Sequence, residues 1–211
     1  MASDFHTHDP GTPLRALVSA ADPAAAPRVS LEFHPWRVRE EFSALPPGFA
    51  ERLRRAAALG ETGLDRLHPP SFAAQCRAFA AALEAGAELR RPLVIHAVRA
   101  AEEIRRMTAG YPAPRLIHGF RGAVRRLEAW LSDGFFVSLH PAALRDGAIG
   151  AFLRRNGCAG IGAESDDLPG FDLASALAEA ERRWELPGFE AAVDRNFGLF
   201  LHQEAPHGSR T

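Results

Sequence analysis

Lysine is missing from this sequence, so all 25 basic residues are arginines. They are balanced by 26 acidic residues, and the formal net charge is −1. This balance excludes the general positive field that drives non-specific binding to nucleic acids. A substrate that carries a phosphate would therefore have to be held by a few local contacts.

Cysteine is scarce, and no long apolar segment is present. Cys76 and Cys158 lie far apart and outside any C-x-x-C spacing, which favours free thiols in a reducing compartment over a disulfide. No apolar run approaches the roughly 20 residues needed to span a bilayer. The amino terminus carries Asp4 and His6 instead of a basic region followed by an apolar stretch, which is not the pattern of a secretory signal. We expect a cytoplasmic protein without a membrane partner.

The composition is typical of one globular domain over residues 1–211. The apolar fraction is 46% and the charged fraction is 24%, and a chain of this length can bury a core of ordinary size. The sequence shows no internal repeats. Its one low-complexity stretch, "SAADPAAAP" at residues 19–27, is predicted to be a loop.

Short apolar segments alternate with helical segments along the chain. The segment "PRVSLEF" alternates like a strand, whereas later segments such as "RPLVIHA" are almost continuously apolar. Ser71 is suited to be the N-cap of the clearest helix, at residues 71–89. The other predicted helices cover residues 46–58, 99–109, 122–132, 143–155, 172–183 and 187–202. Apolar strands that are each followed by a helix predict a parallel sheet covered on its outer face.

The number of strands and the residues at their ends favour a barrel. Seven or eight strands can be counted if "LRALVSA" is included as a weak one. In a TIM-type (β/α) barrel the carboxyl ends of all strands meet at one face, where active sites form. Six possible metal ligands stand at or just after the predicted strand ends: His6, His8, Glu61, His96, His118 and Asp166. The fold therefore predicts that these six side chains converge, which a doubly wound sheet would not explain.

The ligand types suit a pair of divalent ions. Residues two apart on a strand point to the same face, so the imidazoles of His6 and His8 would project from the same side of the strand. Imidazole and carboxylate groups bind Zn²⁺, Mn²⁺ or, with more oxygen ligands, Mg²⁺. Two such ions about 3.5 to 4 Å apart can clamp a displacement at phosphorus. Taken singly, each residue has a simpler explanation: a histidine that ends an apolar strand is often hydrogen-bonded in a core, and Asp166 and Asp167 could cap the helix near residue 172.

A set of motifs in chain order resembles a known family. The segments "DFHTHDP", "LEFHPW", "GETGLD", "PLVIHAVRA", "HGFRG" and "ESDD" resemble the TatD-type metal-dependent hydrolases, and "VDRNFGLF" is similar to that family's closing helix. The resemblance covers nearly the whole chain. It implies a distorted TIM barrel of the amidohydrolase type with two divalent metal ions. It also implies nuclease or other phosphoesterase activity.

The resemblance assigns a role to each of the six candidate ligands. His6 and His8 match ligands of the first metal, and Glu61 matches the glutamate that bridges both ions. His96 and His118 match the two histidines of the second metal. Asp166 matches the aspartate that binds metal and orients the attacking water, so Glu61 and Asp166 carry the catalytic roles.

The chain departs from the family pattern at three places. Only 25 residues separate His8 from His34, too few for the usual strand and helix. The first βα unit is therefore predicted to be shortened, either lost or reduced to a hairpin. Glu32 stands where the family usually has a glycine, and His140 in "SLHP" has no assigned role.

These features predict a phosphoester hydrolase, for instance a 3′–5′ exodeoxyribonuclease, acting on a small phosphoester or a single-stranded nucleic-acid end. Arg121 follows His118 by three residues and could bind a phosphate with its forked guanidinium. Arg99 and His34 are further substrate-binding candidates, although a solvated arginine and a buried structural histidine explain them equally well. Two alternatives stay open: an amide or lactone hydrolase with the same activated water, and a non-catalytic barrel stabilised by metal. The sequence indicates no stacking platform for bases and no protein partner.

Overall fold

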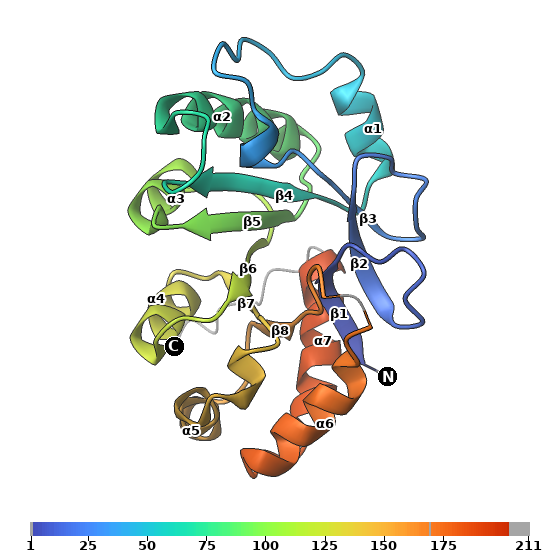
Figure 1. Ribbon diagram of the computed structural model, residues 1–211, viewed down its shortest axis with the longest axis vertical. Coiled ribbons are helices and arrows are strands. Elements are labelled where there is room, and N and C mark those ends of the chain that lie inside the picture. The colour runs from blue at the N-terminus through green and yellow to red at the C-terminus, as the bar shows by residue number, and fades with distance from the viewer. Residues whose placement is uncertain (1, 169, 203–211) are drawn as a thin grey trace, which may run out of the picture.

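The computed structural model describes residues 2–168 and 170–202 and holds one sheet of eight strands in chain order (Figure 1). All neighbouring strands in the sheet are parallel. The strands are β1 (Ser3–Thr7), β2 (Arg15–Ala20), β3 (Val29–Leu31), β4 (Ala58–Asp65), β5 (Leu93–Val98), β6 (Arg115–Phe120), β7 (Phe136–Leu139) and β8 (Ile161–Ala163). The eight strands include "LRALVSA", which forms β2.

The first and last strands meet and nearly close the sheet into a barrel. Thr7 at the end of β1 forms a parallel bridge with Asp166, just after β8. The Asp166 N–H donates to the carbonyl of His6 at 3.0 Å, and the His8 N–H donates to the carbonyl of Asp166 at 3.1 Å. The predicted TIM-type α/β barrel is therefore confirmed.

Helices follow most of the later strands, at nearly the predicted positions. They are α1 (Phe49–Arg55), α2 (Phe72–Glu88), α3 (Ala101–Met107), α4 (Val124–Ser132), α5 (Gly147–Asn156), α6 (Leu173–Arg183) and α7 (Phe189–His202), with short 3₁₀ helices η1 (Pro35–Arg37) and η2 (Ala143–Arg145). Ser71 caps α2 as expected, because its hydroxyl accepts the N–H of Ala74 at 3.3 Å. The predicted helix over residues 143–155 is divided into η2 and α5. Asp146 causes the division, since its carboxylate accepts the N–H of Ala148 at 2.8 Å and starts a new helix.

The first two connections of the barrel contain no helix, which confirms the predicted shortening. The hairpin alternative is wrong, because β1 and β2 are parallel, with Ser3 opposite Arg15. A parallel connection usually needs a dozen or more residues, but only residues 8–14 join these strands. Seven residues can reach roughly 25 Å, which is enough to run back along a five-residue strand of roughly 16 Å. The loop predicted at residues 19–27 lies mainly between β2 and β3, with its first two residues at the end of β2.

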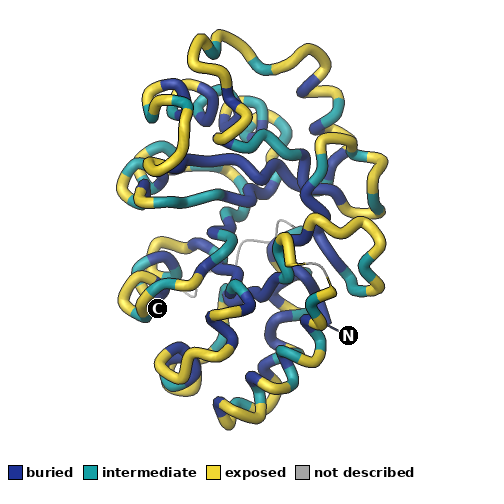
Figure 2. The backbone as a smooth tube through the Cα atoms, in the orientation of Figure 1, coloured by how far each residue is buried: buried dark blue, intermediate teal, exposed yellow. Residues whose placement is uncertain are grey.

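The barrel strands are buried and the outer faces of the helices are exposed (Figure 2). Helix α7 covers β1 and β8 (Figure 1), and the Phe5 ring meets the Phe197 ring edge to face at 5.2 Å between centroids. Gly162 of β8 is required here, because a Cβ at that position would lie 2.7 Å from the Phe5 ring. Among the described residues no helix is long and apolar enough to cross a membrane.

A candidate metal centre at the carboxyl rim of the barrel

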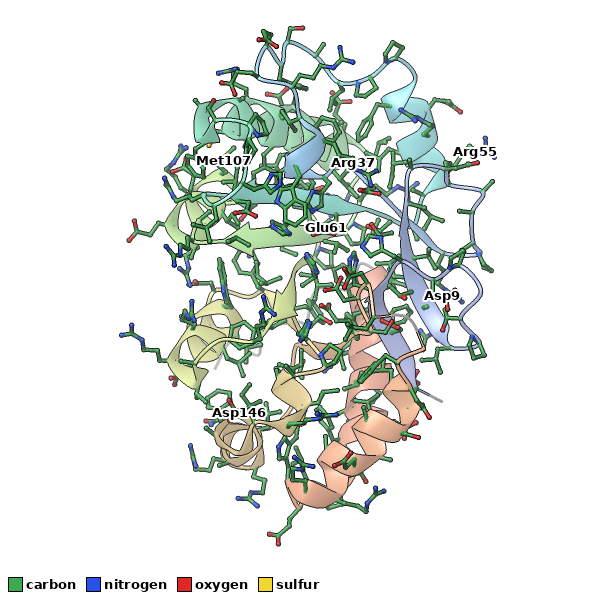
Figure 3. All side chains as sticks on the ribbon, in the orientation of Figure 1. Asp9, Arg37, Arg55, Glu61, Met107 and Asp146 are labelled. Carbon is green, nitrogen blue, oxygen red and sulfur yellow. The ribbon has the colours of Figure 1, made fainter. Side chains whose placement is uncertain are left out.

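The structure brings all six predicted ligands, and His34 as well, to one rim of the barrel. Glu61 on β4, which is labelled in Figure 3, is the residue that the others of this cluster surround. Its carboxylate is within 4 Å of nitrogen atoms from five imidazoles, those of His6, His8, His34, His96 and His118. Residues from the amino terminus and from the middle of the chain therefore converge on one buried acid.

Both carboxylate oxygens of Glu61 face imidazole nitrogens. Oε1 lies 2.6 Å from His96 Nδ1, 2.7 Å from His118 Nε2 and 3.1 Å from His34 Nε2. Oε2 lies 3.4 Å from His6 Nε2 and 3.8 Å from His8 Nε2. Burial alone would raise the pKa of Glu61, but the charge of His118 and the hydrogen bonds from His118 and His34 hold that pKa well below its ordinary value. Glu61 is thus a carboxylate placed to bridge two ligand groups.

Two glycines bring β4 close enough to β5 to set this position. Gly60 and Gly63 have φ angles of 139° and 141°, which side chains rarely adopt. A Cβ on Gly60 would lie 2.3 Å from the carbonyl oxygen of Val94, and a Cβ on Gly63 would lie 2.2 Å from that of His96. The register of the two strands shifts between Leu59 and Thr62, which places Glu61 at the irregularity.

Asp166 has a left-handed backbone conformation, with φ of 56°. Few residues other than glycine adopt this conformation, and it is concentrated at functional sites. The two main-chain hydrogen bonds to β1 hold it in place, and Asp166 Oδ1 lies 3.7 Å from His6 Nε2. The capping alternative for Asp166 is wrong, because the side chain that caps α6 is that of Asp172, which accepts the N–H of Ser175 at 3.0 Å.

The side chains form three overlapping groups whose ligand atoms lie within 4.8 Å of one another: His6, His8 and Glu61; His6, His118 and Asp166; and His34, Glu61 and His96. His34 thus stands among the ligand groups, although the sequence suggested it only for substrate binding. His96 is grouped with His34, whereas the resemblance pairs it with His118. The only sequence signal for His34 as a candidate ligand was its place in the motif "HPW", directly before η1.

The residues fit divalent metal ions. The His6 side chain is 0% exposed, and within the described part of the chain neither of its ring nitrogens has a hydrogen-bond partner. A buried polar atom without a partner is costly, and a cation at Nε2 would remove that cost. The surrounding donors are imidazoles and carboxylates, the set that zinc and manganese accept.

Two further acids, Asp65 and Glu164, support the cluster, and sequence reasoning missed both. Asp65 Oδ2 lies 3.2 Å from His96 Nε2, and Glu164 Oε1 lies 3.6 Å from His118 Nδ1. Glu164 is fully buried and also accepts the N–H of Gly119 at 2.6 Å. Each could have been noticed as an additional acid in a motif already selected: Asp65 in "GETGLD" and Glu164 in "ESDD".

Asp4 joins β1 to the segment that carries Asp166. The Ser165 hydroxyl and N–H donate to Asp4 at 2.7 and 3.2 Å. Burial raises the pKa of Asp4 to about 7, although the bonds from Ser165 oppose this shift. These contacts hold the two segments that present His6 and Asp166.

A cavity of about 980 Å³ opens beside the cluster, and its lining includes His118, Asp166, Arg99 and Arg121. The arginines that the sequence suggested for phosphate binding therefore lie in the same cavity as three of the candidate metal ligands, His96, His118 and Asp166. His140 also lines the cavity, and its Nδ1 accepts the N–H of Ala142 at 3.1 Å.

The fold and the site define a parallel α/β barrel with a cluster of candidate metal ligands at the carboxyl ends of its strands. The sequence model of the family described as TatD related DNase matches residues 12–151, more than half of the chain. The protein therefore belongs to the TatD-related DNase family.

Solved structures with the same fold carry the TatD name. The chain is similar to YjjV, a TatD homologue from Escherichia coli K12, with a TM-score of 0.69 and 18% identity over 95% of this chain and 98% of that chain. It is also similar to a TatD-family hydrolase from Entamoeba histolytica, with a TM-score of 0.64 and 12% identity over 90% and 75% of the two chains. No curated protein sequence matches the chain.

Proposed function

We propose that the protein is a divalent-metal-dependent phosphodiesterase that acts on the ends of single-stranded nucleic acids, for instance as a 3′–5′ exodeoxyribonuclease. The observation that carries the proposal is the position of Glu61 between five imidazoles, two of which line a cavity with exposed arginines. Membership of a family described as DNases supports the same reaction class.

The chain offers enough ligands for two metal ions that share Glu61. His6 and His8 face Oε2, while His34, His96 and His118 face Oε1, and His118 also forms a group with His6 and Asp166. When bound, divalent ions of this kind acidify a water ligand and offset the charge that develops on a phosphate.

Two kinds of side chain act on the substrate in this proposal. The Asp166 carboxylate accepts a hydrogen bond from the attacking water and orients it for in-line displacement. Arg99 and Arg121 are exposed, and among the described residues no hydrogen bond or ion pair occupies either guanidinium. Both are free to bind phosphate oxygens with their paired N–H groups.

The first prediction concerns Asp166. Asp166→Asn should lower kcat for a single-stranded oligonucleotide by about 10²- to 10⁴-fold, because the amide accepts a proton poorly. Asp167→Asn is the matched control, since it removes the same charge one residue along but outside the ligand groups. The measurement is initial rate at saturating Mn²⁺ or Zn²⁺, with thermal melting of both variants to establish that they fold.

Two results would contradict the proposal. A fully active Asp166→Asn variant would refute the role of Asp166. Hydrolysis of lactones or acyl amides without hydrolysis of phosphodiesters would reject the phosphodiesterase in favour of the other metal-dependent hydrolase. Metal analysis of the purified protein should find close to two ions per chain.

A further inference from the structure

Trp36 is unusual among the tryptophans of this protein because its ring is exposed. Trp36 is 49% exposed, whereas Trp130 and Trp184 are 5% and 2% exposed. It lies in η1, two residues after His34, which belongs to one of the three ligand groups. It also lines the cavity that contains the two exposed arginines. A large aromatic side chain is thus left in contact with solvent beside the candidate metal centre.

The ring is exposed but held in place. Its Nε1–H donates to Asp65 Oδ2 at 2.8 Å. One face of the ring stacks on exposed His68, with 4.4 Å between centroids and 17° between planes. The Trp36 ring also contacts two histidines of the cluster, with its centroid 4.8 Å from that of His34 and 5.7 Å from that of His96. The Trp36–His68 pair is therefore a fixed aromatic surface that reaches from the ligand cluster into solvent.

The surroundings of this pair match the two parts of a nucleotide. Arg99 and Arg121 line the same cavity as Trp36 and can take the phosphates. Leu67, next to His68, is 62% exposed and adds apolar surface. The flat face of a base gains free energy from stacking on an aromatic ring, whatever the identity of the base.

We propose that the Trp36–His68 pair is a stacking platform for a nucleobase of the single-stranded substrate. The platform rests on the proposed phosphodiesterase function and specifies it further: the substrate must carry a base near the cleaved bond. Because stacking does not read hydrogen-bond patterns, the platform favours a base over no base and discriminates little among the four bases.

The test compares two oligonucleotides that differ only in their bases. One is tetrathymidylate, and the other is an abasic tetramer with the same phosphates and tetrahydrofuran sugars. The unsubstituted protein should show a KM about tenfold lower for tetrathymidylate, the size expected for one stacked base. Trp36→Ala should raise the KM for tetrathymidylate toward that for the abasic tetramer and so abolish this difference.

Trp36→Phe is the matched control for the hydrogen bond to Asp65. Both Trp36 variants lose that bond, but only Trp36→Ala loses the ring. Trp36→Phe should therefore keep most of the preference for tetrathymidylate. Thymidine 5′-monophosphate should quench the fluorescence of the unsubstituted protein, since the other two tryptophans are buried, whereas deoxyribose 5-phosphate should not.

The outcomes separate the platform from the function on which it rests. Equal KM values for the two tetramers, or a preference that survives in Trp36→Ala, would overturn the platform and leave the phosphodiesterase standing. Failure of the metal-loaded protein to cleave either tetramer would reject the phosphodiesterase and the platform with it.

Discussion

Two histidines of the cluster have an acid near the ring nitrogen that faces away from Glu61. His96 presents Nδ1 to Glu61 and Nε2 to Asp65, whereas His118 presents Nε2 to Glu61 and Nδ1 to Glu164. A carboxylate at the second nitrogen fixes the tautomer and makes the first nitrogen a better metal ligand. The two histidines therefore use different ring nitrogens toward the same carboxylate.

This arrangement predicts that Glu164 controls metal affinity. Glu164→Gln should weaken the binding of Mn²⁺ by roughly 10- to 100-fold, the usual effect of losing such a partner. The affinity can be measured by calorimetric titration of the metal-free protein. Glu128→Gln on the exposed face of α4 is the control and should bind as the unsubstituted protein does. Equal affinities in both variants would show that Glu164 does not act through His118.

At the scale of single residues, the sequence selected candidate ligands that the structure brings together, but it did not predict their grouping. The two-residue spacing and the strand ends were sufficient to select His6, His8, Glu61 and the later histidines. The grouping of His34 with His96 depends on how the segment before η1 packs against β4. This packing is a tertiary contact, and no local sequence pattern predicts it. The substrate-binding roles of Arg99 and Arg121 stay predictions.

At the scale of elements, local chemistry predicted helices well and the first connection poorly. Helix α2 has a side-chain cap at Ser71 and one apolar face, and both are visible in the sequence. The segment Asp9–Pro10–Gly11 indicates only that the chain turns, because a turn residue serves a parallel return as well as a hairpin. The direction of β2 is decided by its neighbours in the barrel, which lie far away in sequence.

A partly buried tyrosine that joins the segment after α3 to the segment after α2 predicts a loss of stability at alkaline pH. Tyr111, the one tyrosine of the chain, donates from its hydroxyl to the carbonyl of Arg91 at 2.8 Å. Burial raises its pKa above the ordinary value of 10.0. The folded protein therefore keeps a proton that the unfolded chain loses, and the stabilising contribution present below pH 10.0 falls as pH rises toward the folded pKa.

This loss can be measured because the chain has no lysine to titrate in the same range. Urea midpoints should fall with rising pH above 10.0, and tyrosinate absorbance should appear only as the protein unfolds. Tyr111→Phe should remove the tyrosine contribution to the pH dependence. A tyrosinate signal at the pH of free tyrosine in the folded protein would contradict the prediction.

At the scale of the whole molecule, the candidate metal centre contains residues from the first strand of the barrel and from the segment after the last strand. β1 supplies His6, the segment after β8 supplies Asp166, and α7 packs on both strands. Asp194 of α7 accepts the hydroxyl of Ser3 at 2.5 Å and pairs with Arg15 at 3.1 Å. Ions bound between these segments would oppose the opening of the barrel.

Metal removal should therefore lower the melting temperature. A metal at 100 times its Kd adds about 2.7 kcal/mol to the free energy of unfolding. For a chain of this size that corresponds to a rise of roughly 5 to 10 °C. Calorimetric scans with Mn²⁺ and with a chelator should differ by this amount, and the difference should shrink in His6→Ala. A melting temperature that does not respond to metal would contradict the site.

Because Thr7 is bridged to Asp166, the barrel can close only after most of the chain has been synthesised. The emerging amino-terminal half already holds His6, His8 and Glu61, but Asp166 and α7 leave the ribosome much later. The candidate metal centre of a nascent chain is thus incomplete until the last strand has docked on β1.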